Sequence, residues 1–328
     1  MIRFAQEFAG PLADGMTQYV AHKRVLGRRY ETEVYALRLF DRYLLAQQLD
    51  TPAAITPAVI EAFLATRPRK RPRSYNHLLG VLRQLFHWLV ERGHLAQSPV
   101  LCSTRRSSFR PAPFILAPES MRLLLKLTAG LHDYPGTAHR ARTYHAIFAL
   151  LYGLGLRVGE VCRLDVADVD RARQLLVIRD TKFGKDRLVP FGPRLGAMLK
   201  GYLVARLACR HVAADAPLFP GHYGSRLRRQ QIGRVFRSLL PALGLTIPAG
   251  ISPPHLHDLR HSFAVGTLLR WYRAGIDPAQ RVLHLSTFMG HVQPESTAVY
   301  LTITSDLLGE AGKRFETFAH PLVKGVRQ

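Results

Sequence analysis

The chain has 328 residues, of which 47% are hydrophobic and 21% are charged, a composition typical of a folded globular protein that excludes a disordered chain. Its 46 Lys and Arg residues against 23 Asp and Glu residues give a net charge of +23 that is spread along the sequence. We therefore expect a polyanionic partner, nucleic acid before membrane, and about two domains from the length.

The sequence has no apolar run of about 18 residues, so we expect no membrane-spanning helix. The first ten residues carry Glu7 and lack the apolar stretch of a secretory signal. Cys102, Cys162 and Cys209 lie far apart without C-x-x-C spacing, which favours reduced thiols over disulfides or a zinc site. These features together predict a cytoplasmic, nucleoid-associated protein.

The first third has the apolar spacing of helices, and no alternation typical of strands. Two stripes recur at three- and four-residue steps: Val34, Leu37, Phe40 and Leu44, then Leu78, Leu82, Leu85, Phe86 and Leu89. Thr56-Pro57 suits a helix start, Ser74 is a candidate cap for the helix that carries the second stripe, and Gly93 is expected to end that helix. Residues 1–103 are therefore predicted to form a small all-α domain.

Two basic segments lie in or after this domain. Five basic residues fall between positions 67 and 73, namely Arg67, Arg69, Lys70, Arg71 and Arg73. An isolated charge run is usually a solvated loop, but the net charge of the chain favours contact with phosphates. Residues 104–115 are rich in Pro, Ser and Arg and include Arg105 and Arg106, so we expect an extended basic linker rather than a loop inside one domain.

Residues 116–328 are predicted to form a second domain. A helix is expected from Pro118 and another over 144–156, and Arg157 directly follows this apolar segment. Burying an arginine is costly unless it meets an anion, which would be a phosphate or a structural partner such as Glu160 or Asp165.

A β-hairpin and two further helices are expected next. Residues 175–179 and 187–190 are β-prone and flank a turn that contains Lys182 and Lys185, which on the residues alone are ordinary exposed charges. Helices are expected over 193–209 and 230–243. The second is preceded by three arginines that suit DNA contact and a solvated helix start equally well, Arg226, Arg228 and Arg229.

The stretch from Pro253 to Tyr300 gathers residues suited to an anionic substrate. Pro253 and Pro254 suit a helix start, and His257, Arg260 and His261 would then share one helix face. His291 follows Gly290, and Tyr300 stands nine residues later. Arginine offers forked donors to phosphate oxygens, histidine moves a proton near neutral pH, and tyrosine is an oxygen nucleophile that needs activation.

A zinc site is the alternative for this segment, because His257 and His261 have the i, i+4 spacing of metalloprotease ligands. Asp258 stands where such enzymes have a glutamate base, and Arg260 between the two histidines would repel the metal. We therefore disfavour zinc and expect His255 and His261 to be structural or DNA-facing polar residues.

These motifs resemble the tyrosine recombinases, also called the phage integrase family. His257-Asp-Leu-Arg260, Gly290-His291 and Tyr300 match its H-x-x-R, glycine-preceded H and Y signature, and Gly155-Leu-Arg157-Val-Gly-Glu160 matches the motif of its first arginine. The hairpin sequence TKFGKDRLVP is similar to the family's lysine motif and aligns Lys182, with Lys185 as the fallback. It departs from the motif at Thr181 and Phe183, where the family has glycines, and the segment between Gly275 and His291 is longer than usual.

The resemblance implies a mainly α fold with a small β-sheet, in which a helical core-binding domain closes over DNA opposite an α+β catalytic domain. It also implies a site-specific DNA recombinase that needs no metal or nucleotide cofactor. Tyr300 would attack a phosphodiester to give a 3′-phosphotyrosyl link, Arg157 and Arg260 would hold the non-bridging oxygens, and Lys182 would protonate the leaving 5′-oxygen.

The resemblance further implies that His257 would assist proton transfer from the tyrosine, that His291 would donate to the phosphate and that Glu160 would support the site. The partner would be double-stranded DNA, bound by a dimer per site and a tetrameric synapse, or with sister recombinases. A helix over 306–319 would pack on its own domain or dock on a neighbouring subunit. The sequence leaves open integration, excision, transposition or replicon resolution, and two alternatives: a type IB topoisomerase-like relaxing enzyme and a non-enzymatic DNA-binding accessory protein.

Overall fold

The computed structural model describes residues 8–69, 71–106, 111–179, 186–208, 212–291, 293, 295–302 and 307–313. The chain divides into two compact units, Met1–Arg110 and Pro111–Gln328. Each unit has its own hydrophobic core. None of the described helices is both long and apolar enough to cross a membrane.

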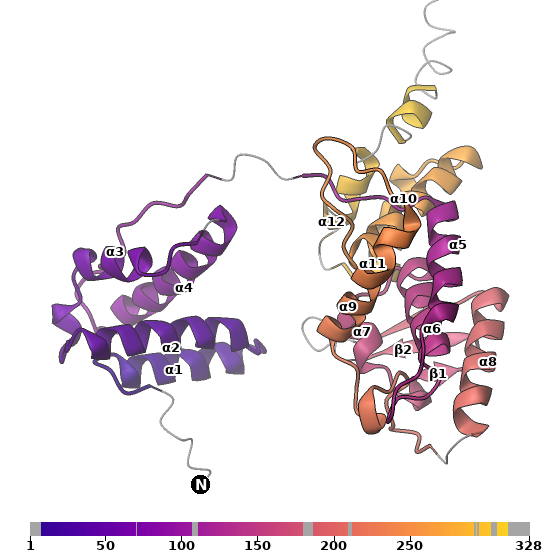
Figure 1. Ribbon diagram of the computed structural model, residues 1–328. Helices are drawn as coiled ribbons and strands as arrows, with labels where there is room; N and C mark the ends of the chain where they lie inside the picture. The colour runs from indigo at the N-terminus through magenta and orange to yellow at the C-terminus, as the bar shows by residue number, and fades with distance from the viewer. Residues whose placement is uncertain are drawn as a thin grey trace, which may run out of the picture. The chain divides into compact units, whose positions relative to one another are not determined.

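Helices are the regular elements of the first unit among its described residues, as the sequence predicts (Figure 1). It contains α1 (Ala13–Val25), α2 (Glu31–Ala46), the 3₁₀ turn η1 (Pro52–Ala54), α3 (Pro57–Ala65) and α4 (Pro72–Glu91). Both predicted apolar stripes face its core, where the ring of Phe40 meets those of Phe63 and Phe86 edge to face at centroid distances of 4.9 and 6.0 Å. Such aromatic packing orients helices as well as burying apolar surface.

Prolines mark the starts of α3 and α4 in this unit. α3 begins at Pro57 after Thr56, as predicted. The predicted Ser74 cap is wrong: α4 begins at Pro72, its N-cap is Arg71, and Ser74 lies inside the first turn. Proline takes the first position because its missing N–H would have no helical partner there and its φ already suits a helix. Past the end of α4, Gly93 has a φ of +73°, in the left-handed region where glycine commonly terminates helices.

The expected linker, residues 104–115, contacts the first unit at its N-terminal end and the second unit at its C-terminal end. The Arg105 guanidinium lies 3.9 Å from the centroid of the Tyr75 ring, and the Arg105 backbone exchanges two 2.8 Å hydrogen bonds with the Asn76 side chain. In the second unit the Ala112 N–H donates to the Gly250 carbonyl at 3.2 Å, and Phe114 is buried.

The second unit combines helices with one small antiparallel sheet, which confirms the predicted fold class. The sheet has the order β1 (Val169–Asp170), β2 (Leu175–Ile178), β3 (Arg187–Pro190), and Leu176 of β2 pairs with Val189 of β3 as the hairpin pattern predicts. Its helices are α5 (Pro118–Leu127), α6 (Arg140–Gly153), α7 (Val158–Arg163), α8 (Pro193–Ala208), α9 (Arg229–Leu239), α10 (Asp258–Arg273), α11 (Val282–Met289) and α12 (Glu295–Ala298).

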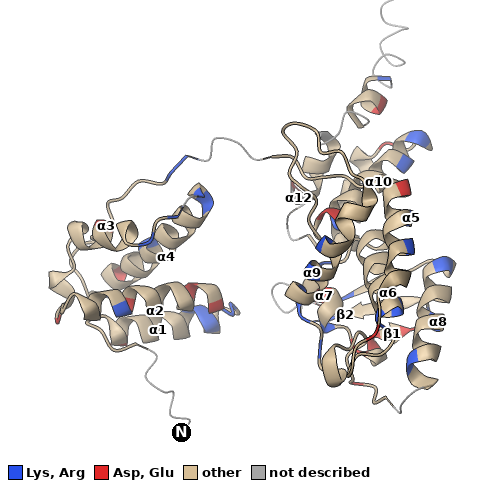
Figure 2. Cartoon of the chain, in the orientation of Figure 1, with Lys and Arg blue, Asp and Glu red and all other residues tan. Residues whose placement is uncertain are grey.

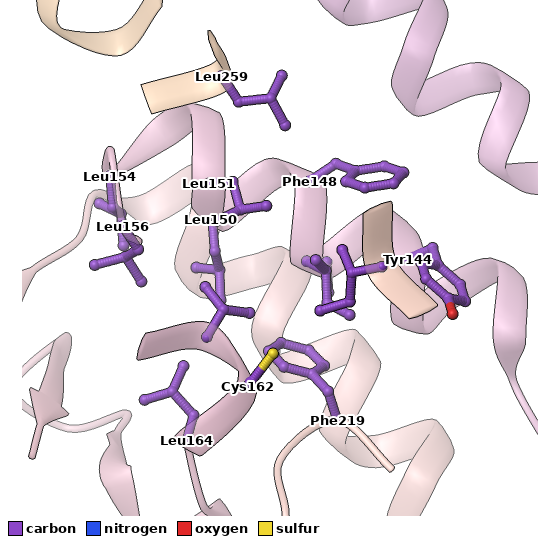
Figure 3. Packing of buried hydrophobic residues seen from close by; sticks show 14 of the residues in the cluster. Tyr144, Phe148, Leu150, Leu151, Leu154, Leu156, Cys162, Leu164, Phe219 and Leu259 are labelled. Carbon is purple, nitrogen blue, oxygen red and sulfur yellow. The ribbon is translucent and has the colours of Figure 1, made fainter. Parts of the chain in front are cut away.

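Helix α6 is the centre of this core. It is apolar on most of its faces and packs against α5, α7, α8 and α10. Figure 3 shows Leu150 and Leu151 of α6 between Leu259 of α10 on one side and Phe219 with Cys162 on the other. Arg157 is the N-cap of α7 and Arg260 lies in α10, so both arginines belong to helices that pack against α6.

In the C-terminal half, the start of one helix differs from the sequence-based expectation. α10 begins at Asp258 and not at Pro253 or Pro254, because the Asp258 carboxylate accepts the His255 N–H at 2.7 Å and closes the first turn there. The long segment before His291 forms a 3₁₀ turn, η6 (Ala279–Arg281), followed directly by α11. Of the predicted helix 306–319, residues 307–313 are helical and the rest lies outside the described residues.

Candidate active site

Glu160 is the buried anion around which the first part of the site is built. It is only 4% exposed and accepts a bidentate pair from Arg187 of β3, with both N–O distances 2.9 Å. Its carboxylate also accepts the backbone N–H and the Nη1 of Arg157, each at 2.8 Å. Burial raises the pKa of Glu160, but these arginine contacts outweigh burial and lower it to about 2, so the group is a carboxylate.

Arg157 also contacts the C-terminal end of α11. Its Nη2 donates to the Gly290 carbonyl at 2.7 Å, while a third of its side chain, 34%, stays exposed. The structural salt bridge to Glu160 considered from the sequence therefore exists, whereas Asp165 pairs with Arg226 instead. The pair fixes the guanidinium of Arg157 and leaves part of it open to a ligand.

Arg260 is almost fully buried, at 1% exposure, and is held by carbonyl groups. Its Nη1 donates to the Gly155 carbonyl and its Nη2 donates to that of Met289 at 2.8 Å. Among the described residues it forms no ion pair. Burial, followed by the charge of Arg157, lowers its pKa to about 9, so the group remains a cation at neutral pH.

Two histidines flank the arginines and are neutral. Burial and the charges of Arg260 and Arg157 lower the pKa of His257 to about 4 and that of His291 to about 3. His291 shares a 2.6 Å hydrogen bond with the hydroxyl of the buried Thr297 on α12, and the bond fixes its ring. A neutral imidazole between two guanidiniums can donate one hydrogen bond and still accept a proton.

Tyr300 lies in the 3₁₀ turn η7 (Val299–Thr302) and is 3% exposed. Its hydroxyl is 2.7 Å from Nδ1 of His261 on α10, and its ring lies parallel to that of His291 at a centroid distance of 6.5 Å. Burial raises the pKa of Tyr300, while Arg260 and Arg157 lower it. The buried phenol therefore keeps its proton at neutral pH unless a base takes it.

Gly290 is required where these contacts converge. It has a φ of +67° at the C-terminus of α11, and an added Cβ would stand 2.7 Å from Nη1 of Arg187. Its carbonyl meanwhile accepts the hydrogen bond from Arg157. The left-handed turn thus directs that carbonyl to one arginine, makes room for a second, and positions His291 as the next residue.

The structure brings together Arg157 and Glu160 from one predicted motif, His257 and Arg260 from a second, and His291 and Tyr300 from the segment that follows. Lys182 and Lys185 lie outside the described residues, as does Lys70. Two residues of the site were missed as functional candidates: Arg187 lies within the lysine motif TKFGKDRLVP, and His261 follows Arg260. The i, i+4 relation of His261 to His257 was the available signal, and their rings meet edge to face at 4.7 Å.

The predicted DNA-contacting arginines differ in how they are held. Arg226 pairs with Asp165 at 2.6 Å and donates to the Cys162 carbonyl at 3.1 Å, contacts that serve the fold. Arg228 is the N-cap of α9, and its N–H donates to Gln231 at 2.8 Å. Arg67 and Arg69 are half-buried. The other described arginines of this predicted set are exposed: Arg71, Arg73, Arg105, Arg106, Arg226, Arg228 and Arg229.

The charges of the site select for an anion. Two of the three guanidiniums, those of Arg157 and Arg187, pair with the carboxylate of Glu160. The third, that of Arg260, forms no ion pair among the described residues and donates to carbonyl groups. Positive charge is therefore in excess beside a buried tyrosine hydroxyl. A phosphate group would complete the charge balance and offer its phosphorus to that hydroxyl. Within the described parts of the chain no group of three or more His, Cys, Asp or Glu side chains is placed to hold a metal ion.

Comparison with known proteins gives matches over most of the chain. The sequence model of the phage integrase family matches residues 122–306. The integrase/recombinase y4rB of Sinorhizobium fredii is 35% identical over 301 residues, which cover 91% of this chain and 95% of that protein. Tyrosine recombinase XerC of Chromobacterium violaceum is 30% identical over 301 residues, covering 88% of this chain and 90% of the relative.

Solved structures share the fold at lower identity. The Tn1549 transposon integrase in complex with circular intermediate DNA superposes with a TM-score of 0.66 at 17% identity, covering 94% of this chain and all of the other. The XerH site-specific recombinase bound to a palindromic difH substrate gives 0.63 at 17% identity, covering 87% of this chain and 79% of the other.

Proposed function

This chain belongs to the phage integrase family, and from that premise we propose that it cuts and rejoins double-stranded DNA at specific sites through a 3′-phosphotyrosyl link to Tyr300. The observation that carries the proposal is the buried Arg260, held by carbonyls and without an ion pair among the described residues, in the same site as Arg157 and the Tyr300 hydroxyl. A desolvated cation of this kind suits an anion that arrives with the substrate.

Each arginine has a separate task in this mechanism. The forked guanidiniums of Arg157 and Arg260 bind the non-bridging oxygens of the phosphodiester and stabilise the negative charge that grows in the transition state. Glu160 holds Arg157 in place through the 2.8 Å pair, with Arg187 as the second counter-ion of the carboxylate. Rigid donors of this kind need little rearrangement when charge develops.

The remaining roles concern protons. His291, fixed by Thr297, donates to a phosphate oxygen, and His257, whose ring contacts that of His261, assists proton transfer from the tyrosine without contacting its hydroxyl directly. Lys182 protonates the leaving 5′-oxygen. The phosphotyrosyl bond retains the energy of the broken phosphodiester, so the 5′-hydroxyl can reverse the reaction without a metal or nucleotide.

We propose that the helical unit contributes to DNA affinity through the basic residues between 67 and 73, and that DNA is bound by a dimer per site and recombined in a tetrameric synapse. Several solved relatives are described as bound to DNA, one of them as a dimer on its core site. The function would be integration, excision or transposition of a mobile element, or resolution of replicon multimers. The integrase/recombinase and XerC relatives support this range of functions.

Covalent trapping tests the proposal. The purified protein is incubated in EDTA with fragmented genomic DNA of its source, and complexes are separated under denaturing conditions. We expect a protein–DNA adduct that disappears in Tyr300→Phe and persists in Tyr223→Phe, a matched control at an exposed tyrosine. Sequencing of the attached DNA would then define the target.

The other outcomes are distinct. Relaxation of plasmids of any sequence that depends on Tyr300 would favour the topoisomerase-like alternative. Tight, salt-sensitive binding without an adduct would favour the accessory protein. An adduct that survives in Tyr300→Phe would overturn the assignment of the nucleophile.

A further inference from the structure

The hydroxyl of Tyr300 has a partner that the family signature does not single out. Nδ1 of His261 lies 2.7 Å from the oxygen of the buried Tyr300, a normal length for a hydrogen bond, and the bond is partly buried. The imidazole extends from α10, one residue after Arg260, so its position is fixed by the same helix that holds a phosphate-binding guanidinium. The Tyr300 hydroxyl and His261 thus form one unit.

We propose that His261 is the general base that takes the proton from Tyr300 as the tyrosine attacks phosphorus. The inference rests on the proposed function and assigns the first proton acceptor within it. As the bond between the tyrosine oxygen and phosphorus forms, the phenolic proton moves to Nδ1 of His261. The bond between phosphorus and the 5′-oxygen breaks, and that oxygen takes a proton from Lys182. Rejoining runs the same transfers in reverse.

The competing histidines are less well placed to take this proton. Among the described residues His257 makes no side-chain hydrogen bond, and its contact is with the ring of His261. The Nδ1 of His291 is engaged by Thr297, and its ring centroid is 6.5 Å from that of Tyr300. A general base must lie within hydrogen-bonding distance of the proton that it removes, and His261 meets this requirement.

The surrounding charges suit this role. Among the described residues, the titratable groups near His261 include His257 and Asp258 of its own helix, Tyr300 of η7 and His291 of the segment after α11, with the cations of Arg260 and Arg157 in the same site. These cations oppose the addition of further positive charge to the site before DNA binds. The phosphodiester adds negative charge beside it and so stabilises the imidazolium that forms.

The test uses the full-length protein and the duplex recovered by covalent trapping, nicked so that cleavage is irreversible. His261→Asn is the informative variant because its amide oxygen can stand where Nδ1 stands and hold Tyr300, yet it is not basic. We expect single-turnover cleavage to slow about a hundredfold or more. His284→Asn, at an exposed position on α11, is the matched control and should cleave as the unmodified protein does. DNA binding by each variant reports that it is folded.

A duplex with sulfur in place of the 5′-bridging oxygen separates the two proton transfers. A thiolate leaves without protonation, so this duplex should rescue Lys182→Ala and leave the defect of His261→Asn in place. Rescue of His261→Asn by sulfur would overturn the proposal, because His261 would then act on the leaving group.

The pH profile gives an independent readout. The cleavage rate of the unmodified protein should rise with pH and then level off, and the rate of His261→Asn should lack that step. Normal cleavage by His261→Asn alongside slow cleavage by His261→Ala would overturn the proposal in favour of a purely positioning role. Failure of the unmodified protein to form any Tyr300-dependent adduct would instead refute the proposed function itself.

Discussion

Glu160 is the residue on which most ionic contacts of the site converge. It neutralises Arg187 and Arg157 from a position that is 4% exposed, and each arginine also donates to a carbonyl, that of Phe288 or Gly290. Removal of one partner from a buried ion pair leaves the remaining charges uncompensated, which costs more than loss of the attraction itself. At the residue scale, the stability of the second unit and the placement of Arg157 therefore depend on one carboxylate.

Glu160→Gln keeps the shape of the side chain and removes its charge. We expect the free energy of unfolding to fall by about 3 kcal/mol, because two guanidiniums lose their counter-ion. Urea unfolding measures the change. Glu119→Gln is the matched control, since Glu119 pairs with Arg122 on the surface, and its unfolding midpoint should not move. A Glu160→Gln protein as stable as the unmodified one would show that the ion pairs do not stabilise the unit.

The two neutral histidines predict how stability depends on pH. Their folded pKa values, about 4 for His257 and about 3 for His291, lie below the ordinary value of 6.5, so the unfolded chain binds protons first as pH falls. Stability is therefore full above pH 6.5 and is lost as pH falls toward these values. His291→Asn should make that loss shallower between pH 7 and 5 in urea unfolding, whereas the exposed His284→Asn should not. An unchanged slope for His291→Asn would contradict the burial of a neutral imidazole.

At the scale of elements, the end of α11 sets the geometry of the site. Gly290 directs its carbonyl to Arg157, and Met289 before it provides the carbonyl for Arg260. Both guanidiniums are thus held by the last turn of one short helix, and His291 follows it directly. A change at this turn reaches the arginines and the histidine together.

Gly290→Ala tests this turn, with Gly275→Ala as the matched control. Both glycines have a left-handed φ, +67° and +76°, so each substitution should cost about 1–2 kcal/mol from the backbone alone. Only at Gly290 does the added Cβ meet a neighbour, Arg187 at 2.7 Å, whereas nothing lies within 4 Å at Gly275. Urea unfolding should show the larger loss for Gly290→Ala, and cleavage should fall in that variant alone. Equal effects of the two substitutions would exclude a role for the Arg187 contact.

Helices and the hairpin could be predicted because their signals are local. The stripe from Val34 to Leu44 and the β-prone runs that flank the turn depend on residues a few positions apart, and both are seen in the structure. The convergence of Arg157, Arg260 and Tyr300 could be expected only from motif spacing and a family resemblance. The contacts of Arg187 with Glu160 and of His261 with Tyr300 join residues 27 and 39 positions apart. No periodicity encodes such pairs, because they depend on how the packed elements meet. The start of α10 was misplaced for a related reason: the turn that the Asp258 carboxylate closes with the His255 N–H, just ahead of the helix, outweighs the proline preference.

At the scale of the molecule, charge is the dominant property. The net charge of the chain is +23, and Figure 2 shows Lys and Arg at positions along both units. Such a protein binds DNA partly by displacing counter-ions from phosphates, so its affinity falls with salt. Contacts of this kind add affinity and register without reading the base sequence.

Arg73→Ala tests the proposed contribution of the basic residues between 67 and 73. The side chain is exposed at the start of α4. Loss of one phosphate contact should weaken binding to all duplexes alike and reduce the slope of log affinity against log salt by about 1. Fluorescence anisotropy with a labelled duplex at several KCl concentrations measures the slope. Arg122→Ala, which removes an arginine paired with Glu119, should leave it unchanged. Identical slopes for Arg73→Ala and the unmodified protein would remove this segment from the DNA interface.

The most direct measurement of the central claim is chemical identification of the protein–DNA bond. The trapped adduct would be digested with nuclease and protease, and the peptide that contains Tyr300 would be examined by mass spectrometry. The mechanism predicts a nucleotide 3′-phosphate attached to Tyr300 and a free 5′-hydroxyl on the other fragment of the cleaved strand. A nucleotide on any other residue, or an unmodified Tyr300 peptide together with cleaved DNA, would contradict it.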